Sequence, residues 1–261
     1  MRLDPLTAAL HRRTGEHGSV MLMYHSVRPG KGTPDWTWAV SRHSLESQLD
    51  FLDAEGYATP TLADLVDGPP VGRSVVITFD DGYADNLAAC EALARRGMRA
   101  TWFIVTGSIG QPPAWPADGR PAGRLLDADE LRQMRAAGME IASHGVTHAR
   151  LPTLDDERLE HELADSKAAL ESLLGSPVSS FAYPYGEWDA RCARAVRQAG
   201  YRAACTTRSG WAMRDGDPYS LRRLTVTNLD TVASLARKLC FGSHDVGWAD
   251  LARYAWRRLR A

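Results

Sequence analysis

The sequence is poor in cysteine and in net charge, and it contains no long apolar run. Its four cysteines among 261 residues include no C-x-x-C pair, which excludes a zinc knuckle and a dense disulfide framework and predicts reduced, mostly buried thiols. A formal net charge of -1 argues against a protein that binds duplex nucleic acid, because such a protein needs a basic face. Neutral partners such as sugars remain open.

Segments that direct a chain into or across a membrane are also missing. No apolar stretch approaches the roughly 20 residues that span a bilayer, and residues 1–15 lack the apolar core of a secretion signal. These absences predict a cytoplasmic protein without a transmembrane segment. Residues 241–261 are basic, and we interpret the helix expected over Trp248–Arg260 as a closing helix, with peripheral membrane contact as the weaker alternative.

Short apolar runs alternate with amphipathic stretches from Val20 onward, which is typical of βα units with parallel strands. Helical spacing is clearest over residues 44–55, 85–96 and 155–174. The length and rhythm predict an α/β fold of barrel size in a single domain, 1–261, with its core over about 19–240. About seven strands are expected, at Ser19–Tyr24, Ser74–Phe79, Arg99–Val105, Met139–Ser143, Ser179–Tyr183, Tyr201–Thr206 and Leu221–Thr227.

Two adjacent carboxylates follow the predicted strand Ser74–Phe79. Because successive side chains of a strand point to opposite faces, Asp80 and Asp81 should diverge and can serve different purposes, one as a metal ligand and the other as a free base. The plainer interpretation is a solvated turn in which an aspartate caps the next helix, and Asp-Asp-Gly alone would favour it.

Two histidines four residues apart favour a metal site over a solvated turn at the two aspartates. His144 and His148 follow the predicted strand Met139–Ser143, and imidazoles at this spacing can converge on one cation. With one carboxylate they make a ligand set that leaves positions open for water, the pattern of a catalytic metal site with a neighbouring carboxylate as base. The set suits one divalent ion, with Zn²⁺ first and Co²⁺, Ni²⁺, Fe²⁺ or Mn²⁺ as alternatives.

A third cluster, Tyr183-Pro184-Tyr185-Gly186, ends another predicted strand. Proline fixes the turn, so the backbone N–H of Tyr185 could point into the mouth of a barrel and donate to an oxyanion. An aromatic turn packed on the core is equally consistent with this cluster.

Together and in this order, the three clusters resemble the motifs of the polysaccharide deacetylase (NodB-homology, carbohydrate esterase family 4) family. The resemblance covers about Val20 to Leu239 and implies a deformed (β/α) barrel. It also implies a metal-dependent hydrolase that removes an N-acetyl group from an acetamido sugar and releases acetate. The residue roles that it implies are Asp80 as base, Tyr185 N–H as oxyanion donor, and Asp81, His144 and His148 as metal ligands.

One departure from the family pattern concerns the general acid. Most members carry a Leu-x-His motif near the carboxyl terminus, whereas the corresponding run here is Met21–His25 at the amino terminus. This arrangement is similar to the circularly permuted branch that includes poly-N-acetylglucosamine deacetylases, and it implies that His25 protonates the departing amine. His244 is the competing candidate, but no predicted strand leads into it.

A second departure is Ala182, where many relatives place an arginine that orients the catalytic aspartate. Arg222 or Arg223, at the predicted strand Leu221–Thr227, is the candidate replacement. The alternative is that both arginines pair with nearby aspartates at the surface, where a salt bridge contributes little.

Aromatic placement suggests the substrate class. Several tryptophans fall in predicted loops or at element ends, where a flat ring can lie against a sugar face, although each could instead roof the barrel. We therefore expect an acetylated sugar or glycan of undetermined length. O-deacetylation of a carbohydrate remains an alternative, as does a catalytically silent glycan-binding module, which the filled metal and base positions disfavour. The expected substrate contacts are Trp36, Trp38, Trp188, Trp211 and Arg223.

Overall fold

A seven-stranded parallel sheet forms the centre of the protein, in the spatial order β8-β7-β6-β5-β4-β1-β9. The computed structural model describes residues 3–11, 18–68, 72–116, 119–120 and 122–249. All seven predicted strands are present, each shorter than its apolar run. They are β1 (Val20–Tyr24), β4 (Val75–Phe79), β5 (Thr101–Ile104), β6 (Glu140–Ser143), β7 (Ser180–Ala182), β8 (Ala203–Cys205) and β9 (Leu224–Thr225).

The two edges of this sheet meet through the segment that leads into β9. Leu221 forms an isolated parallel bridge with Cys205 in β8, whereas Leu224 and Thr225 pair with β1. The run predicted as one strand is thus shared between two neighbours, and the sheet curls on itself. The prediction of a deformed (β/α) barrel with about seven parallel strands is confirmed.

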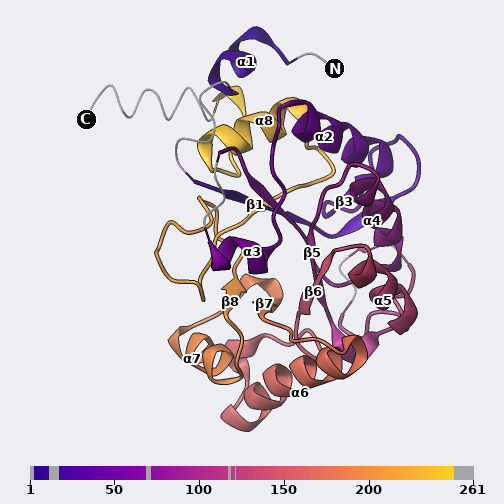
Figure 1. The fold of residues 1–261 in the computed structure, drawn as a ribbon, viewed down its shortest axis with the longest axis vertical. Helices are drawn as coiled ribbons and strands as arrows, with labels where there is room; N and C mark the ends of the chain where they lie inside the picture. Colours follow the sequence, from indigo (N-terminus) through magenta and orange to yellow (C-terminus); the bar gives the residue numbers. More distant parts are fainter. Residues whose placement is uncertain (1–2, 12–17, 69–71, 117–118, 121, 250–261) are drawn as a thin grey trace.

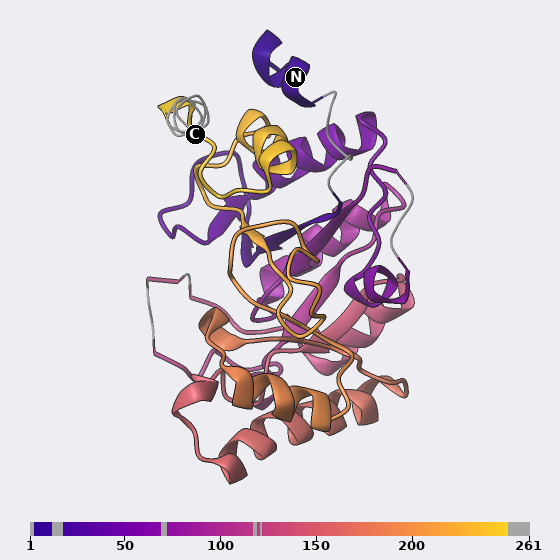
Figure 2. The same ribbon diagram turned by 90° about the vertical axis from the view of Figure 1, so that its left-hand side faces the viewer.

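Helices cover the outside of the curled sheet, and successive helices lie side by side around it (Figure 1). The first helix, α1 (Pro5–His11), packs on the last one, so both ends of the described chain meet at one side (Figure 2). The outer helices are α2 (Arg42–Ala54), α4 (Leu87–Ala94), α5 (Ala128–Ala136), α6 (Asp156–Leu174), α7 (Ala190–Gln198) and α8 (Val232–Phe241).

Side chains of the strands alternate between two apolar layers. Leu22 and Ile77 belong to the layer beneath the helices, whereas Met21, Val76 and Phe103 belong to a separate cluster inside the barrel. This alternation is the two-residue period of a strand with both faces buried. The barrel interior is therefore packed with side chains at this level.

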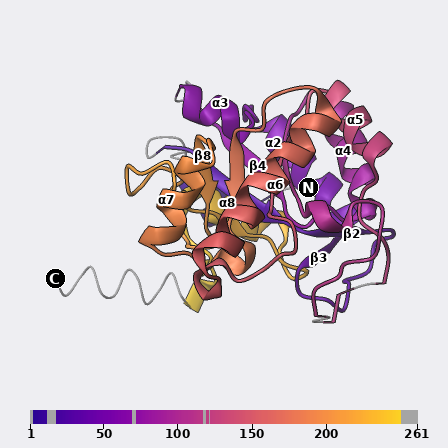
Figure 3. The same ribbon diagram turned by 90° about the horizontal axis from the view of Figure 1, so that it is seen from below.

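The two ends of the barrel are closed differently (Figure 3). At the amino ends of the strands lies α3 (Leu62–Asp67), where Leu62 N donates to Thr101 Oγ1 at 2.9 Å. At the carboxyl ends lies a two-stranded parallel pair that the sequence did not predict, β2 (Ser26–Arg28) and β3 (Ala39–Ser41). Polar side chains placed after the strands therefore face the end that α3 leaves open.

The helix predicted over Trp248–Arg260 lies outside the described residues from position 250 onward. The three helices expected from apolar spacing are present as α2, α4 and α6, and α4 is preceded by the 3-10 turn Ala84–Asn86. Among the described helices, none is long and apolar enough to cross a membrane.

Candidate active site

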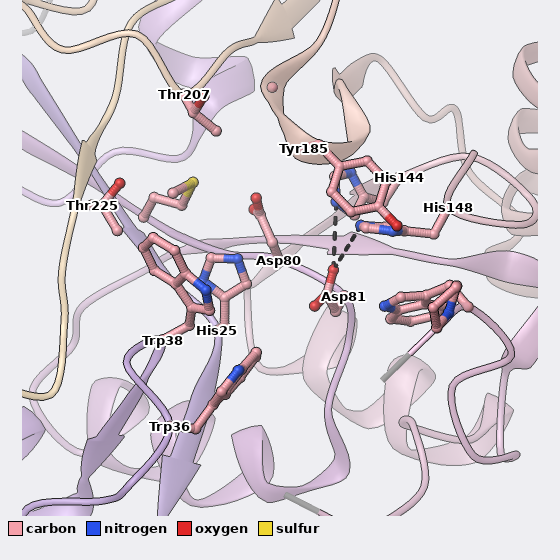
Figure 4. A pocket seen from close by; sticks show the side chains of 14 residues that line it. His25, Trp36, Trp38, Asp80, Asp81, His144, His148, Tyr185, Thr207 and Thr225 are labelled. Atoms are coloured by element: carbon pink, nitrogen blue, oxygen red, sulfur yellow. Dashed lines mark ion pairs between the residues drawn. The ribbon is translucent and has the colours of Figure 1, made fainter. Parts of the chain in front are cut away.

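A cavity of about 270 Å³ lies at the carboxyl ends of the strands (Figure 4). Functional side chains of this kind of barrel gather at that end because every parallel strand delivers its next residues there. The cavity collects the predicted residues that follow β1, β4, β6 and β7. They are His25, Asp80, Asp81, His144, His148 and Tyr185.

Three of these side chains form a candidate metal centre. Asp81 Oδ1 lies 3.5 Å from His144 Nε2 and 3.3 Å from His148 Nε2. All three residues are buried, and their ligand atoms lie within 4.8 Å of one another. Asp81 Oδ1 is buried without a hydrogen-bond partner among the described residues, as is His148 Nδ1. A buried carboxylate oxygen facing two imidazole nitrogens fits a divalent cation.

The protonation of this cluster also fits a cation. Burial lowers the pKa of His144 to about 4, and its Nδ1 lies 2.8 Å from the carbonyl oxygen of Ala182. A neutral ring that donates through Nδ1 leaves its Nε2 lone pair for a metal. Burial alone would raise the pKa of Asp81. Contact with His148 has the opposite and larger effect, so the pKa of Asp81 lies below its ordinary value. Asp81 and His144 are therefore in the forms that bind metal at neutral pH.

Left-handed backbone marks this end of the barrel. Asp81, His148 and Tyr185 have φ values of 72°, 61° and 59°, and they are the non-glycine residues with positive φ in the described chain. Such conformations cost of order 1–3 kcal/mol each and persist where surrounding structure enforces them. Here they turn the two ligands and the tyrosine toward one cavity.

A buried carboxylate on α6 supports the loop between the two histidines. Glu162 accepts hydrogen bonds from Val146 N at 2.7 Å, from Thr147 N at 3.0 Å and from the Thr147 hydroxyl. A Cβ at Gly145 would lie 2.7 Å from Glu162 Oε2, so only glycine allows this approach. The carboxylate therefore fixes the backbone that connects His144 to His148.

Asp80 leaves the same strand as Asp81 but faces a different partner. Its two carboxylate oxygens accept from Arg223 Nη1 at 2.6 Å and from Arg223 Nη2 at 2.8 Å. Both side chains are buried, and the pair joins residues 143 positions apart. Burial would raise the pKa of Asp80, but Arg223 and then His144 lower it, and the net direction is downward.

The two candidate arginines thus have different surroundings. Arg222 forms an ion pair with Asp215 near the surface, as one alternative expected, whereas Arg223 is fully buried behind Asp80. Arg223, which was expected among the substrate contacts, is not among the residues that line the cavity. Its Nε also donates to Thr206 O at 3.0 Å, so three of its nitrogens are held by protein.

His25 lies across the cavity from the candidate metal centre (Figure 4). Its ring centroid is 6.0 Å from that of Trp36 and 5.8 Å from that of Trp38, and Asn86 Nδ2 donates to its carbonyl oxygen at 2.7 Å. His244 does not line this cavity, since its Nε2 accepts from Thr225 N at 2.9 Å. Of the two candidates for the acid, the cavity contains His25.

The predicted tryptophans divide between the cavity and the surrounding structure. Trp36 and Trp38 line the cavity, whereas Trp188 and Trp211 are not among its lining residues. Trp188 stacks on Tyr183 with centroids 5.9 Å apart, and Trp211 packs closely over Gly242. Their rings are thus occupied by packing, the alternative that the sequence left open.

Three contributors to this site were not among the predicted site residues. Trp115, one of the tryptophans that the sequence places in loops, lines the cavity and stacks on His148 with ring centroids 4.6 Å apart. Glu162 binds the loop between His144 and His148, and Asn86 binds the carbonyl of His25. In the sequence, both residues look like ordinary polar residues on the surface of a helix or turn. No spacing signal separates such supporting residues from solvated ones.

Comparison with known proteins identifies the family. The model of the polysaccharide deacetylase family matches residues 67–204. The chain belongs to the polysaccharide deacetylase family. It is 32% identical over 213 residues to YxkH of Bacillus subtilis (strain 168), a candidate polysaccharide deacetylase, with 79% of this chain and 71% of that one covered. The recognition made from the three motifs is confirmed, and so is the prediction of a hydrolase of this class.

Other relatives in this comparison are more distant. The chain is 26% identical over 132 residues to a chitooligosaccharide deacetylase of Rhizobium leguminosarum bv. trifolii, covering 50% of this chain and 54% of the relative, about half of its length. The structure of IcaB from Ammonifex degensii superposes with a TM-score of 0.70 at 25% identity, covering 87% of this chain and 98% of that one.

Proposed function

We propose that this protein removes the N-acetyl group from an acetamido sugar and releases acetate, using one divalent ion held by Asp81, His144 and His148. Supporting this is one observation: the three ligand atoms share a cavity with an ion-paired carboxylate, Asp80, and with His25 on the opposite wall. The name of the Rhizobium relative, a chitooligosaccharide deacetylase, agrees with it. Two imidazoles and a carboxylate suit Zn²⁺ first.

The metal, when bound, would polarise both a water molecule and the carbonyl oxygen of the substrate. Asp80 accepts the proton of the attacking water, because its low pKa leaves the carboxylate ionised and Arg223 fixes the plane of its oxygens. The backbone N–H of Tyr185 donates to the developing oxyanion, a role supported by the left-handed turn at this residue.

His25 protonates the departing amine. An amide needs this step because an unprotonated amine is a poor leaving group, so the acid is as necessary as the base. The indoles of Trp36 and Trp38 hold the imidazole on the wall that faces Asp80, and they offer flat apolar surface to the sugar ring. The same two tryptophans thus position the acid and the substrate.

An assay of acetate release tests the proposal. The metal-loaded protein is incubated with acetylated chitooligosaccharides and, in parallel, with an O-acetylated xylan, with and without a chelator, and its metal content is measured. We expect acetate from the chitooligosaccharides, loss of turnover on chelation and recovery on adding Zn²⁺. Turnover that survives complete metal removal would contradict the metal centre. Metal binding without turnover on any substrate would favour a glycan-binding module, and release from xylan alone would favour an esterase.

A further inference from the structure

The loop between β2 and β3 carries both indoles that lie beside His25. Residues 29–38 form neither helix nor strand, and most of their side chains are exposed. Trp36 is 8% exposed and Trp38 is 37% exposed, yet both rings flank the imidazole of His25 (Figure 4). Because an exposed loop has little burial to fix its shape, these two rings need support from another part of the fold.

Asn228, in the turn that follows β9, supplies such support. Its backbone N donates to Thr37 O at 2.9 Å, and its Nδ2 donates to Pro34 O at 2.8 Å. The two carbonyls flank Trp36 in the sequence, so one residue binds the loop on both sides of that indole. Since β9 pairs with β1, and His25 directly follows β1, the loop is tied to the part of the sheet that carries the acid.

A buried ion pair that the proposed chemistry does not use fixes the turn of Asn228. Asp230 Oδ2 accepts from Lys238 Nζ at 2.6 Å and from Thr227 N at 2.8 Å, and both charged side chains are buried. The carbonyl oxygen of Asp230 accepts from Gln48 Nε2 on α2 at 3.1 Å. A buried polar network whose members are bonded to one another holds a single arrangement. The donors of Asn228 therefore have a fixed direction.

The imidazole of His25 depends on its neighbours for its orientation. Asn86 binds the main-chain carbonyl of His25, which fixes the backbone but not the rotation of the ring. His25 Nδ1 is buried and has no hydrogen-bond partner within the part of the chain that the structure describes. The packing of Trp36 and Trp38 therefore decides which way the ring faces. A shift of their loop would let the ring turn away from the cavity.

We propose that Asn228 is a positioning residue for the acid. By holding the loop of Trp36 and Trp38, it keeps the imidazole of His25 in the orientation that protonates the departing amine. Asn228 is not among the residues that line the cavity, so it acts through the indoles and not on the substrate. This inference rests on the proposed function and adds a residue to it. Only a leaving group that needs a proton should depend on Asn228.

Two substitutions separate the hydrogen bond from the shape of the side chain. Asn228→Ala removes the Nδ2 donor and leaves the main-chain N–H in place. Asn228→Asp keeps the size and the turn preference of asparagine but puts a carboxylate oxygen against Pro34 O. Thr59→Ala is the matched control. It removes the bond from Arg99 N to Thr59 Oγ1, 3.1 Å long, which joins segments 40 positions apart near the amino ends of the strands.

The first measurement compares two leaving groups. The Zn²⁺-loaded proteins are assayed on an acetylated chitooligosaccharide and on 4-nitrophenyl acetate, whose leaving group departs as an anion without a proton. Both Asn228 variants should lower kcat on the chitooligosaccharide about tenfold and change kcat on the ester less than about twofold. Thr59→Ala should change neither. Equal losses on both substrates would overturn the inference, as would wild-type kcat on the chitooligosaccharide in both variants.

The second measurement does not depend on turnover. Diethyl pyrocarbonate modifies accessible imidazoles, and peptide mass analysis follows the rate at His25 alone. We expect this rate to rise at least about twofold in both Asn228 variants, because the indoles no longer hold the ring, and to stay unchanged in Thr59→Ala. An unchanged rate in the Asn228 variants would overturn the inference. Failure of the wild-type protein to release acetate from any substrate would contradict the proposed function, and the modification rate would still decide whether Asn228 positions His25.

Discussion

The metal side and the base side of the cavity are assembled from different stretches of chain. Asp81, His144 and His148 come from two short motifs, each within a few residues of one strand end. Asp80 depends on Arg223, 143 positions away, and faces His25 from the first strand. The metal side is thus a product of local sequence, whereas the base side exists only once β1 and β9 have joined the same sheet.

Removal of the proton-transfer groups gives the largest expected effect and separates the base side of the cavity from the metal side. Asp80→Asn and His25→Ala should each lower the rate of acetate release at least about a thousandfold, because each removes one required proton transfer. Metal content should stay at the wild-type level, since neither residue belongs to the ligand cluster. Acetate release and elemental analysis measure the two quantities on the same samples. Wild-type turnover in either variant would remove the role assigned to that residue.

The buried ion pair gives the largest expected effect on stability. Arg223→Met leaves Asp80 as an uncompensated buried charge and should lower the free energy of unfolding by about 3–5 kcal/mol. Adding Asp80→Asn should restore part of that loss, because the orphaned charge is then gone.

The neighbouring arginine is the matched control. Arg222→Met removes the pair with Asp215 near the surface and the hydrogen bond from Arg222 Nη1 to Ser209 O, and should cost only about 1–2 kcal/mol. Urea unfolding of the three variants and of wild type gives the comparison. Equal destabilisation by Arg222→Met and Arg223→Met would contradict the view that the Arg223–Asp80 pair is buried and stabilising whereas the Arg222–Asp215 pair is a weak surface contact.

A third prediction tests whether Glu162 on α6 supports the loop that carries the metal ligands. Glu162→Gln removes the negative charge that accepts from Val146 N and Thr147 N, and beside the Thr147 hydroxyl its NH₂ group can only donate, so affinity for Zn²⁺ should fall about 10- to 100-fold. Glu160→Gln, exposed on the same helix, should leave affinity unchanged. Competition with a chromophoric chelator measures both. Unchanged affinity in Glu162→Gln would show that the loop holds its shape without the carboxylate.

The smallest expected effect concerns the tryptophans. Trp38→Ala should raise KM for chitooligosaccharides about three- to tenfold by removing the exposed indole face. Trp188→Ala should leave KM unchanged, because that ring stacks on Tyr183 away from the cavity. Steady-state kinetics on one trimer preparation compares the two. A larger change in KM for Trp188→Ala than for Trp38→Ala would indicate that the sugar binds near Trp188 instead of Trp38.

The same division explains what the sequence could and could not predict. The strands and the motifs at their ends were predictable, since apolar runs and ligand spacing are local properties. Arg223 remained one of two candidates because the local sequence near Leu221–Thr227 does not determine which arginine points inward. The direction is set by the way this segment closes the barrel. Trp188 and Trp36 both occur near predicted element ends, and only packing separates their roles.

The left-handed residues have a consequence for how this protein tolerates change. Glycine adopts positive φ without penalty, so replacing Tyr185 by glycine would relax the backbone while deleting a ring that lies 4.4 Å from that of His148. The same exchange at Asp81 or His148 would delete a ligand. A selection for thermal resistance alone would therefore drift toward glycine at these three positions and dismantle the site. Libraries built on this barrel should hold them fixed.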